Sequence, residues 1–239
     1  CALFSTHLKG LELDYAKRFY KWNPSQCLYS KKYRDYIENE AKKDLADYFW
    51  DLFEQNALPY FKSLRRSINY NDAHEHNLLL NSNLHNPEIN GVIDFGDVLY
   101  TETINEVAIA CAYAGMTMPD PLEAWAHLIK AFHDIFPLEE KEVQVLFPLI
   151  AARLMITVSN SAYNRHKEPE NKYLQISEKG AWDLLFKMKE IAPELAHYTF
   201  RDTCGMEACP SHSLYLKWYE SFNDFHPVIE LDKLKFGPL

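Results

Sequence analysis

Two stretches of the sequence decide the fold, and they read Ile-Asn-Tyr-Asn-Asp-Ala-His-Glu-His-Asn (residues 68–77) and Asp-Phe-Gly-Asp (residues 94–97). Between them stand two short apolar runs, at residues 78–80 and 91–93, joined by a polar segment rich in turn-forming residues. Two apolar runs with such a connection are typical of a small β hairpin. The sequence therefore predicts a polar loop, a hairpin and, where the second strand ends, an Asp-Phe-Gly turn.

The polar groups in this pattern suit phosphoryl transfer. That reaction needs a group to accept the proton of the acceptor hydroxyl and oxygen ligands for Mg²⁺ on the phosphates. A loop carboxylate followed five residues later by an amide can serve both needs, with Asp72 facing the hydroxyl and Asn77 the metal. Asp94 adds an anionic ligand, and oxygen ligands of this kind suit Mg²⁺ better than zinc.

The rest of the chain is predicted to be mostly helical, which gives a mainly helical α+β fold. Only 7 of the 239 residues are glycine, and few glycines mean few tight turns with positive φ. Apolar residues recur at helical spacing over 35–64, with a break or kink at Pro59. Further helices are predicted over 104–112, from the capped start at 120–123, and over 138–163, 177–191 and 215–222.

Composition and charge exclude several classes of function. The formal net charge is −9, which disfavours nucleic acid because phosphate backbones attract clustered Lys and Arg. It weakly favours cationic or amine-bearing small ligands, and ordinary solubility charge is the preferred explanation. The five cysteines form no Cys-x-x-Cys pair, and neither a secretory signal nor an apolar run of membrane-spanning length is visible. We therefore expect a cytoplasmic protein without a membrane partner.

The two motifs resemble those of the aminoglycoside phosphotransferase/choline kinase family, which shares the protein-kinase-like fold. That family carries a His-x-Asp-x-x-x-x-Asn loop followed by Ile-Asp-Phe or Ile-Asp-Trp. The chain matches it with Asp72, Asn77, Ile93, Asp94 and Phe95. The resemblance implies that Asp72 is the catalytic base, that Asn77 and Asp94 bind Mg²⁺, and that ATP is the phosphoryl donor.

The resemblance also implies a place for the chain within a larger protein. Residues 1–239 would form the C-terminal lobe of the fold, with residues 1–11 as its first helix and His7 near the end of that helix. Active members also have a small N-terminal lobe with a strand lysine, and this chain starts too late to contain one. We therefore expect ATP to bind between this lobe and a missing N-terminal lobe, and the chain alone to be inactive.

Residues 96–101 and 153–182 resemble a narrower branch of the family. That branch includes hydroxylysine kinase-like and homoserine kinase-like proteins, and kinase-like domains fused to class-III aminotransferases. The implied acceptor is a small molecule with a hydroxyl group: an amino alcohol, a hydroxylated amino acid or an aminoglycoside-like compound. A fused downstream domain is a further partner that this branch implies.

Three residues around the motifs are interpreted as supporting groups. Tyr70 stands where the family usually has a His that holds the loop against the metal-binding turn. Tyr70 can pack and donate one hydrogen bond, so we assign it the same role, although it also fits a weakened enzyme. Glu106 is interpreted as support for the loop rather than as a substrate ligand. Arg153 stands among apolar residues and is interpreted as a buried ion-pair partner rather than a carboxylate clamp.

Three further residues are candidates for acceptor binding. Asp97 follows the Phe-Gly turn, where it could anchor a substrate ammonium or, alternatively, cap the turn. His74 and Glu75 could line the same cleft. His74-Glu75-His76 lacks the His-Glu-x-x-His spacing of a helical zinc site, so a zinc-dependent hydrolase is only the third hypothesis. The second is a non-catalytic binding or regulatory module, which the Tyr70 substitution and the missing lobe suggest.

Overall fold

The computed structural model of the chain describes residues 1–83, 85–171 and 176–221. These residues divide into two compact units, of which the first is Cys1–Ala208 and the second begins at Cys209. The second unit contains one described helix, α8 (His212–Glu220). It confirms the helix predicted near the C-terminus, except that Phe222 lies outside the described residues.

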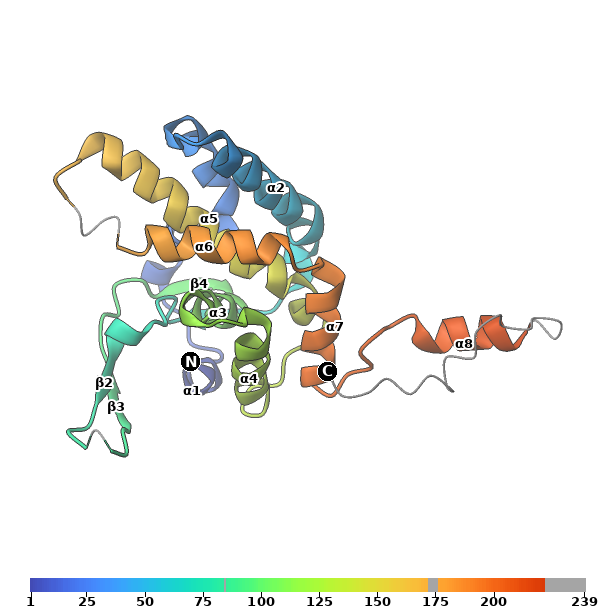
Figure 1. The fold of residues 1–239 in the computed structure, drawn as a ribbon. Helices are drawn as coiled ribbons and strands as arrows, with labels where there is room; N and C mark the ends of the chain where they lie inside the picture. The colour runs from blue at the N-terminus through green and yellow to red at the C-terminus, as the bar shows by residue number, and fades with distance from the viewer. Residues whose placement is uncertain (84, 172–175, 222–239) are drawn as a thin grey trace. The chain divides into compact units, whose positions relative to one another are not determined.

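The first unit is mainly helical with a few short strands, as predicted (Figure 1). Its α-helices are α1 (Ala2–His7), α2 (Glu40–Asn56), α3 (Asn105–Thr117), α4 (Pro121–His133), α5 (Glu140–Lys167), α6 (Glu178–Lys189) and α7 (Pro193–Thr203). Its 3₁₀ segments are η1 (Asp14–Ala16), η2 (Pro24–Tyr36), η3 (Leu58–Ser63) and η4 (Glu75–Asn77). Its strands are β1 (Arg66–Asn69), β2 (Leu78–Leu80), β3 (Ile89–Val92) and β4 (Leu99–Glu102).

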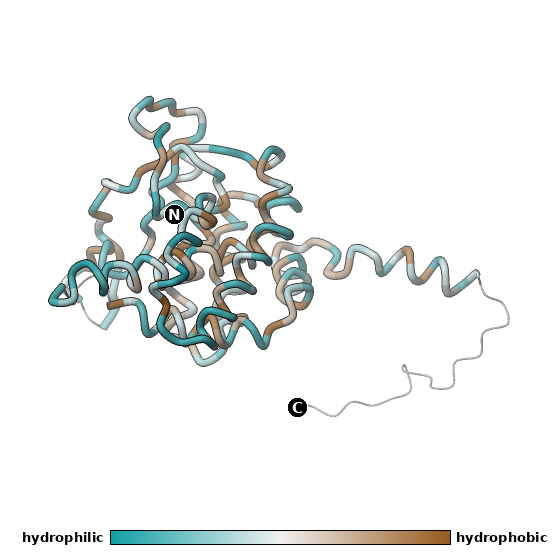
Figure 2. Tube along the Cα trace, turned by 90° about the horizontal axis from the view of Figure 1, so that it is seen from above, coloured by the Kyte–Doolittle hydropathy of each residue, from teal (hydrophilic) through white to brown (hydrophobic). Residues whose placement is uncertain are grey.

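Helix α5 is the centre of the core. It packs against η2, α2, α3, α6 and α7, and the apolar residues gather in this helical body (Figure 2). By length and composition α5 could cross a membrane, but all of its apolar window is buried inside the unit. A helix that is apolar all round and covered by other helices is a core helix.

Local signals explain most helix boundaries. The Asp120 carboxylate accepts hydrogen bonds from the backbone N–H groups of Leu122 and Glu123 at 2.9 and 3.2 Å, so the predicted cap of α4 is confirmed. Helix α2 ends at Asn56, and Pro59 lies in the following 3₁₀ segment, as predicted. The predicted start of this helix at residue 35 is wrong, because Asn39 caps α2 and the preceding residues form η2.

The predicted hairpin is present. Strand β2 pairs antiparallel with β3, with Leu78 opposite Val92 and Leu80 opposite Ile89. A second two-stranded sheet, β1 with β4, was not predicted, and Ile68 and Asn69 belong to it rather than to the loop. Its residues Ser67, Asn69, Thr101 and Glu102 are polar, buried and hydrogen-bonded to one another, so these strands lack the alternation of apolar and polar residues that identifies a strand in a sequence.

Candidate active site

The loop of residues 70–77, called the motif loop below, is held in shape by its own side chains. The Asn77 amide nitrogen donates to Asp72 Oδ2 at 2.8 Å and to the Asp72 backbone carbonyl at 3.1 Å. It also lies 3.2 Å from His74 Nε2. The loop therefore curls so that Asp72 and Asn77 meet. Because the amide nitrogen faces Asp72, the amide oxygen of Asn77 points away and can accept a cation.

The backbone of Ile93 joins the motif loop to the Asp-Phe-Gly turn. The Ile93 N–H donates to the Asn77 carbonyl at 3.1 Å, and the Tyr70 hydroxyl donates to the Ile93 carbonyl. Asp94 follows with a φ of 59°, a left-handed conformation that Asp tolerates better than most residues. Its Oδ1 accepts from the Gly96 N–H at 3.3 Å, and the carboxylate is exposed. The two candidate metal ligands, Asn77 and Asp94, are thus both tied to the backbone of Ile93.

Tyr70 makes the contacts expected of a residue that holds the loop against the turn. Its buried ring lies 5.7 Å from the Phe4 ring of α1 and 5.3 Å from the Phe95 ring, between centroids. Burial and the charge of Asp72 raise the pKa of Tyr70 to about 12. The hydroxyl is therefore protonated at neutral pH and remains a hydrogen-bond donor.

Glu106 lies behind the motif loop. It is fully buried on α3, and its Oε1 accepts from the Asn71 backbone N–H at 2.6 Å. Asn71 has a φ of 67°, so this hydrogen bond fixes a left-handed residue next to Asp72. Burial raises the pKa of Glu106 to about 7, although N–H groups of Asn71 and Tyr70 oppose the rise. A carboxyl with no exposed surface supports the loop and cannot meet a substrate.

Asp72 is held in its ionised form. Burial by itself would raise its pKa, but the hydrogen bond with His74 and the charge of Arg153 outweigh burial, and the pKa is lowered. Arg153 Nη2 lies 3.7 Å from Asp72 Oδ1, and the arginine is buried. The interpretation of Arg153 as a buried ion-pair partner is confirmed, and its partner is the candidate base.

Asp97 lies beside the same cluster and is tied to the segment before η2. The Tyr20 hydroxyl donates to Asp97 Oδ1, and Arg18 donates to the Gly96 and Val98 carbonyls at 2.7 and 3.0 Å. Burial raises the pKa of the Asp97 carboxyl, and the charge of Asp72 adds to the rise. A cation bound here would relieve this repulsion.

His74, Glu75 and His76 lie close together but differ in exposure, and the His76 backbone N–H donates to His74 Nδ1 at 3.2 Å. His74 is half-buried, with Nε2 3.3 Å from Asp72 Oδ2 and its ring 4.9 Å from that of Tyr113. Glu75 and His76 are exposed and lie 3.8 Å apart. Within the described ranges, no group of three or more His, Cys, Asp or Glu side chains could hold a metal ion. This arrangement offers the zinc hypothesis no support.

The donor set fits Mg²⁺. Asp94 presents an exposed carboxylate, and Asn77 presents an amide oxygen. The backbone of Ile93, which precedes Asp94 and donates to the Asn77 carbonyl, connects the two residues. Mg²⁺ usually binds through one or two carboxylates together with waters and substrate phosphates, and it does not need an all-protein cage. The absence of a three-acid cluster among the described residues is therefore compatible with this ion.

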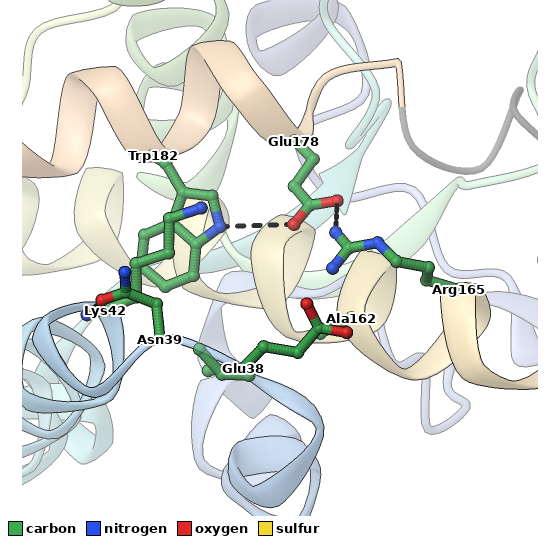
Figure 3. Close-up of a pocket in the computed structure, with 8 residues that line it drawn as sticks. Glu38, Asn39, Lys42, Ala162, Arg165, Glu178 and Trp182 are labelled. Atoms are coloured by element: carbon green, nitrogen blue, oxygen red, sulfur yellow. Dashed lines mark hydrogen bonds and ion pairs between the residues drawn. The ribbon is translucent and has the colours of Figure 1, made fainter.

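A small cavity lies apart from the motifs, between α2, α5 and α6 (Figure 3). Its volume is about 70 Å³, and no predicted site residue lines it. Arg165 forms an ion pair with Glu178 across it, and Lys42 lies 5.0 Å from the Trp182 ring centroid. Because its charged groups are largely engaged with one another, we interpret it as a gap between three helix ends.

Comparison with known proteins places the chain in a family. The sequence profile of the phosphotransferase enzyme family matches residues 12–139, more than half of the chain. The chain belongs to this family. The matched range includes the motif loop, the Asp-Phe-Gly turn and Glu106, so the family recognised from the two motifs is confirmed.

The similar curated proteins are hydroxylysine kinases. The protein from Mus musculus is 28% identical over 204 residues, which cover 81% of this chain and 54% of the relative. The protein from Xenopus laevis is 28% identical over 190 residues, covering 76% and 50%, and that from Bos taurus is 27% identical over 173 residues, covering 70% and 46%. The chain spans about half the length of these relatives. No solved structure gives a significant match.

Sequence reasoning missed several residues that the structure brings to the site. They are Arg18, Tyr20, Trp22 and Tyr113. Arg18, Tyr20 and Trp22 lie in a basic and aromatic run that matches no motif, and Tyr113 lies in an apolar helix. No local signal could have identified them.

Proposed function

We propose that the chain is the acceptor- and metal-binding part of an ATP- and Mg²⁺-dependent small-molecule kinase. Membership in the phosphotransferase family supports this proposal. The observation that carries it is the arrangement of Asp72, Asn77 and Asp94. The Asn77 side-chain amide donates to Asp72, and the backbone N–H of Ile93, the residue before Asp94, donates to the Asn77 carbonyl. A base and two oxygen ligands held this closely suit in-line transfer of a phosphoryl group.

In the proposed reaction, Asp72 accepts the proton of the acceptor hydroxyl as the hydroxyl oxygen attacks the γ-phosphorus of ATP. The bond from this phosphorus to the β–γ bridging oxygen breaks, and ADP leaves. The lowered pKa of Asp72 keeps the base ionised before the reaction. Asn77 and Asp94 would hold Mg²⁺, which neutralises charge on the phosphates.

The proposed acceptor carries both a hydroxyl and an ammonium group. Burial raises the pKa of Asp97, and the charges of Asp72 and Asp94 add to the rise, so a cation beside these three carboxylates is favoured electrostatically. A carboxylate that anchors the ammonium would fix the hydroxyl relative to Asp72, with His74 and Glu75 at the edge of the cleft. Hydroxylysine has both groups, and the relatives named above are hydroxylysine kinases.

The proposal extends to the whole protein. The relatives are about twice as long as the matched region, and the family resemblance implies a nucleotide-binding lobe before this one, so we infer that a further N-terminal lobe completes the ATP site. All five cysteines are free thiols in the structure. Free thiols are compatible with the reducing cytoplasm that we propose as its location.

The test is a coupled assay of ADP formation by the full-length protein with ATP and Mg²⁺. The acceptors are hydroxylysine, ethanolamine, homoserine and an aminoglycoside, with glycerol and glucose as neutral hydroxyl compounds. Lysine is the matched control, because it lacks only the hydroxyl of hydroxylysine. We expect Mg²⁺-dependent turnover with at least one hydroxylated amine and none with lysine.

Two results would contradict the proposal. Turnover confined to the neutral compounds would show that the acceptor carries no ammonium group and that Asp97 does not anchor one. Binding of ATP without turnover of any acceptor would favour the non-catalytic binding module instead.

A further inference from the structure

Arg153 is buried and is held by groups from two other parts of the chain. Its Nη1 donates to the Trp22 carbonyl at 3.1 Å, and its Nη2 donates to the Tyr113 hydroxyl at 2.8 Å. The guanidinium carbon lies 5.2 Å from the Trp22 ring centroid and 5.5 Å from that of Tyr113. Arg153 is 4% exposed. Because Trp22 and Tyr113 each accept a hydrogen bond from the guanidinium group and each place a ring near it, the position of the guanidinium group is fixed.

The contact between Arg153 and Asp72 is one of charge and not a hydrogen bond. Nη2 lies 3.7 Å from Asp72 Oδ1, which is beyond the usual range for an N–H···O bond. The other carboxylate oxygen, Oδ2, accepts from the Asn77 amide and faces His74. The two oxygens of Asp72 are therefore unequal: Oδ2 is engaged, and Oδ1 faces a cation that does not occupy its lone pairs.

This inequality has a chemical meaning if Asp72 is a base. A base oxygen that accepts a strong hydrogen bond from arginine is a poor proton acceptor, because the proton must compete with that donor. A base oxygen without any nearby cation loses the charge that fixes its orientation. The Trp22 carbonyl accepts one N–H of Nη1 and the Tyr113 hydroxyl accepts one N–H of Nη2, and these two bonds hold the guanidinium with Nη2 3.7 Å from Asp72 Oδ1.

We propose that Arg153 is a positioning residue, caged by Tyr113 and Trp22, that orients Asp72 by charge while leaving Oδ1 open to receive the acceptor proton. The proposal rests on the proposed kinase function and adds a residue to it. Arg153 does not touch the substrate, since it is almost fully buried. This excludes its alternative interpretation as a carboxylate clamp.

Tyr113→Phe is the sharpest variant. It removes the oxygen that accepts from Nη2 but keeps the ring that packs on His74 and beneath the guanidinium. The freed Nη2 should then hydrogen-bond to Asp72 Oδ1. We expect kcat to fall about tenfold, since general-base catalysis contributes roughly 10²–10⁴-fold and only part of it is lost. The KM values for acceptor and ATP should stay within about twofold, because no substrate contact changes.

Substitution of Arg153 itself tests the charge. Arg153→Lys keeps a cation, so it should retain more of kcat than Arg153→Met, which has none. Arg165→Met is the control, because Arg165 lies on the same helix, about 18 Å farther along its axis, and pairs with Glu178 (Figure 3). It should leave kcat unchanged even where it lowers stability.

Crystal structures of the wild type, Tyr113→Phe and Arg153→Met full-length proteins give a second readout that does not depend on turnover. We expect Nη2 to approach Asp72 in the tyrosine variant and the Asp72 carboxylate to rotate in the methionine variant, which has no cation. If Asp72 keeps its orientation in the methionine variant, the positioning role is wrong, whatever the kinetics. If Asp72 moves as expected but the wild type phosphorylates no acceptor, the inference stands and the proposed function fails.

Discussion

Tyr70 shows how one polar atom can replace another within the same architecture. The family usually has His at this position, and both side chains can donate a hydrogen bond to a carbonyl. In this chain the Tyr70 hydroxyl donates to the Ile93 carbonyl while its ring packs against Phe4 and Phe95, which also contact each other. The substitution therefore keeps the link between the motif loop and the turn.

Removal of that hydroxyl should have a measurable cost. Tyr70→Phe leaves the ring contacts and removes the donor, so we expect the free energy of unfolding to fall by about 1 kcal/mol. Urea denaturation gives the measurement. Tyr36→Phe is the control, since the Tyr36 side chain makes ring contacts but its hydroxyl makes no hydrogen bond within the described part of the chain. Equal free energies of unfolding for the two variants would show that the hydrogen bond of the Tyr70 hydroxyl does not stabilise the fold.

Asp72→Asn should separate chemistry from folding. The amide keeps the size of the carboxylate and can still accept from Asn77, but it cannot take a proton. We expect kcat to fall by roughly 10²–10⁴-fold, with the melting temperature within a few degrees of the wild type. A loss of activity below about threefold would remove Asp72 from the role of base, since a base contributes far more.

Glu106 should make stability depend on pH. Its pKa is raised from 4.5 to about 7, so the folded state binds a proton that the unfolded state has already released in this range. This stabilisation is fully present below pH 4.5 and is lost as pH rises through 7. Glutamine resembles the protonated form of Glu106. In Glu106→Gln, the free energy of unfolding should therefore decrease less between pH 4.5 and pH 7 than it does in the wild type.

The matched control is Glu123→Gln, because Glu123 is exposed on α4. Urea denaturation at a series of pH values should give it the same slope as the wild type. A wild-type slope in Glu106→Gln would mean that Glu106 titrates as an ordinary carboxyl.

At the scale of elements, helix packing depends on one close approach. Gly115 of α3 leaves room for α4 and α6, because a Cβ there would lie 2.7 Å from Trp125 Nε1 and 3.0 Å from Leu184 Cδ2. Trp125 is fully buried, and its Nε1 donates to the Cys111 carbonyl at 2.8 Å. It cannot move aside without losing that bond.

Two helical glycines should therefore respond in opposite ways to alanine. We expect Gly115→Ala to lower the free energy of unfolding by about 1–3 kcal/mol through overpacking. Gly180→Ala meets only the flexible side chain of Met116, at 3.3 Å, and should keep or raise stability by up to about 1 kcal/mol through helix propensity. Thermal or urea unfolding of both variants is the check, and similar losses would contradict the packing argument.

Elements with a local signal could be predicted, and those that depend on distant partners could not. The cap at Asp120 and the paired apolar runs of β2 and β3 are written in adjacent residues. Strands β1 and β4 pair residues that lie thirty or more positions apart, and the buried Ser67 and Asn69 of β1 look like loop residues in a sequence. Their hydrogen bonds to Thr103 and Glu102 are tertiary contacts, which no window of sequence contains.

At the scale of the whole molecule, the same distinction divides the candidate site. Asp72, Asn77 and Asp94 could be found because two contiguous motifs carry them. Arg153 and Tyr113 reach the site from two different helices, and their roles depend on how those helices pack. Burial of an arginine among apolar residues indicated an ion pair but could not name its partner.

The net charge of −9 gives a prediction for the molecule as a whole. An excess of negative charge attracts cationic ligands, and salt screens this attraction, since the Debye length falls from about 30 Å at 0.01 M to about 8 Å at 0.15 M. At saturating ATP, we expect kcat/KM for a cationic acceptor to fall severalfold over this range. Steady-state assays with a neutral acceptor should show little change, and an equal fall for both would contradict the argument.

The closed base of the hairpin has a consequence for how such proteins can diverge. Strand β2 starts directly after Asn77, β3 ends directly before Ile93, and the hydrogen bond from Ile93 to Asn77 shuts the base. The distance between Asp72 and Asp94 is therefore set at the base and not by the number of residues at the tip. Insertions and deletions at the hairpin tip should be tolerated in evolution, while a single deletion at either end of the base should abolish function.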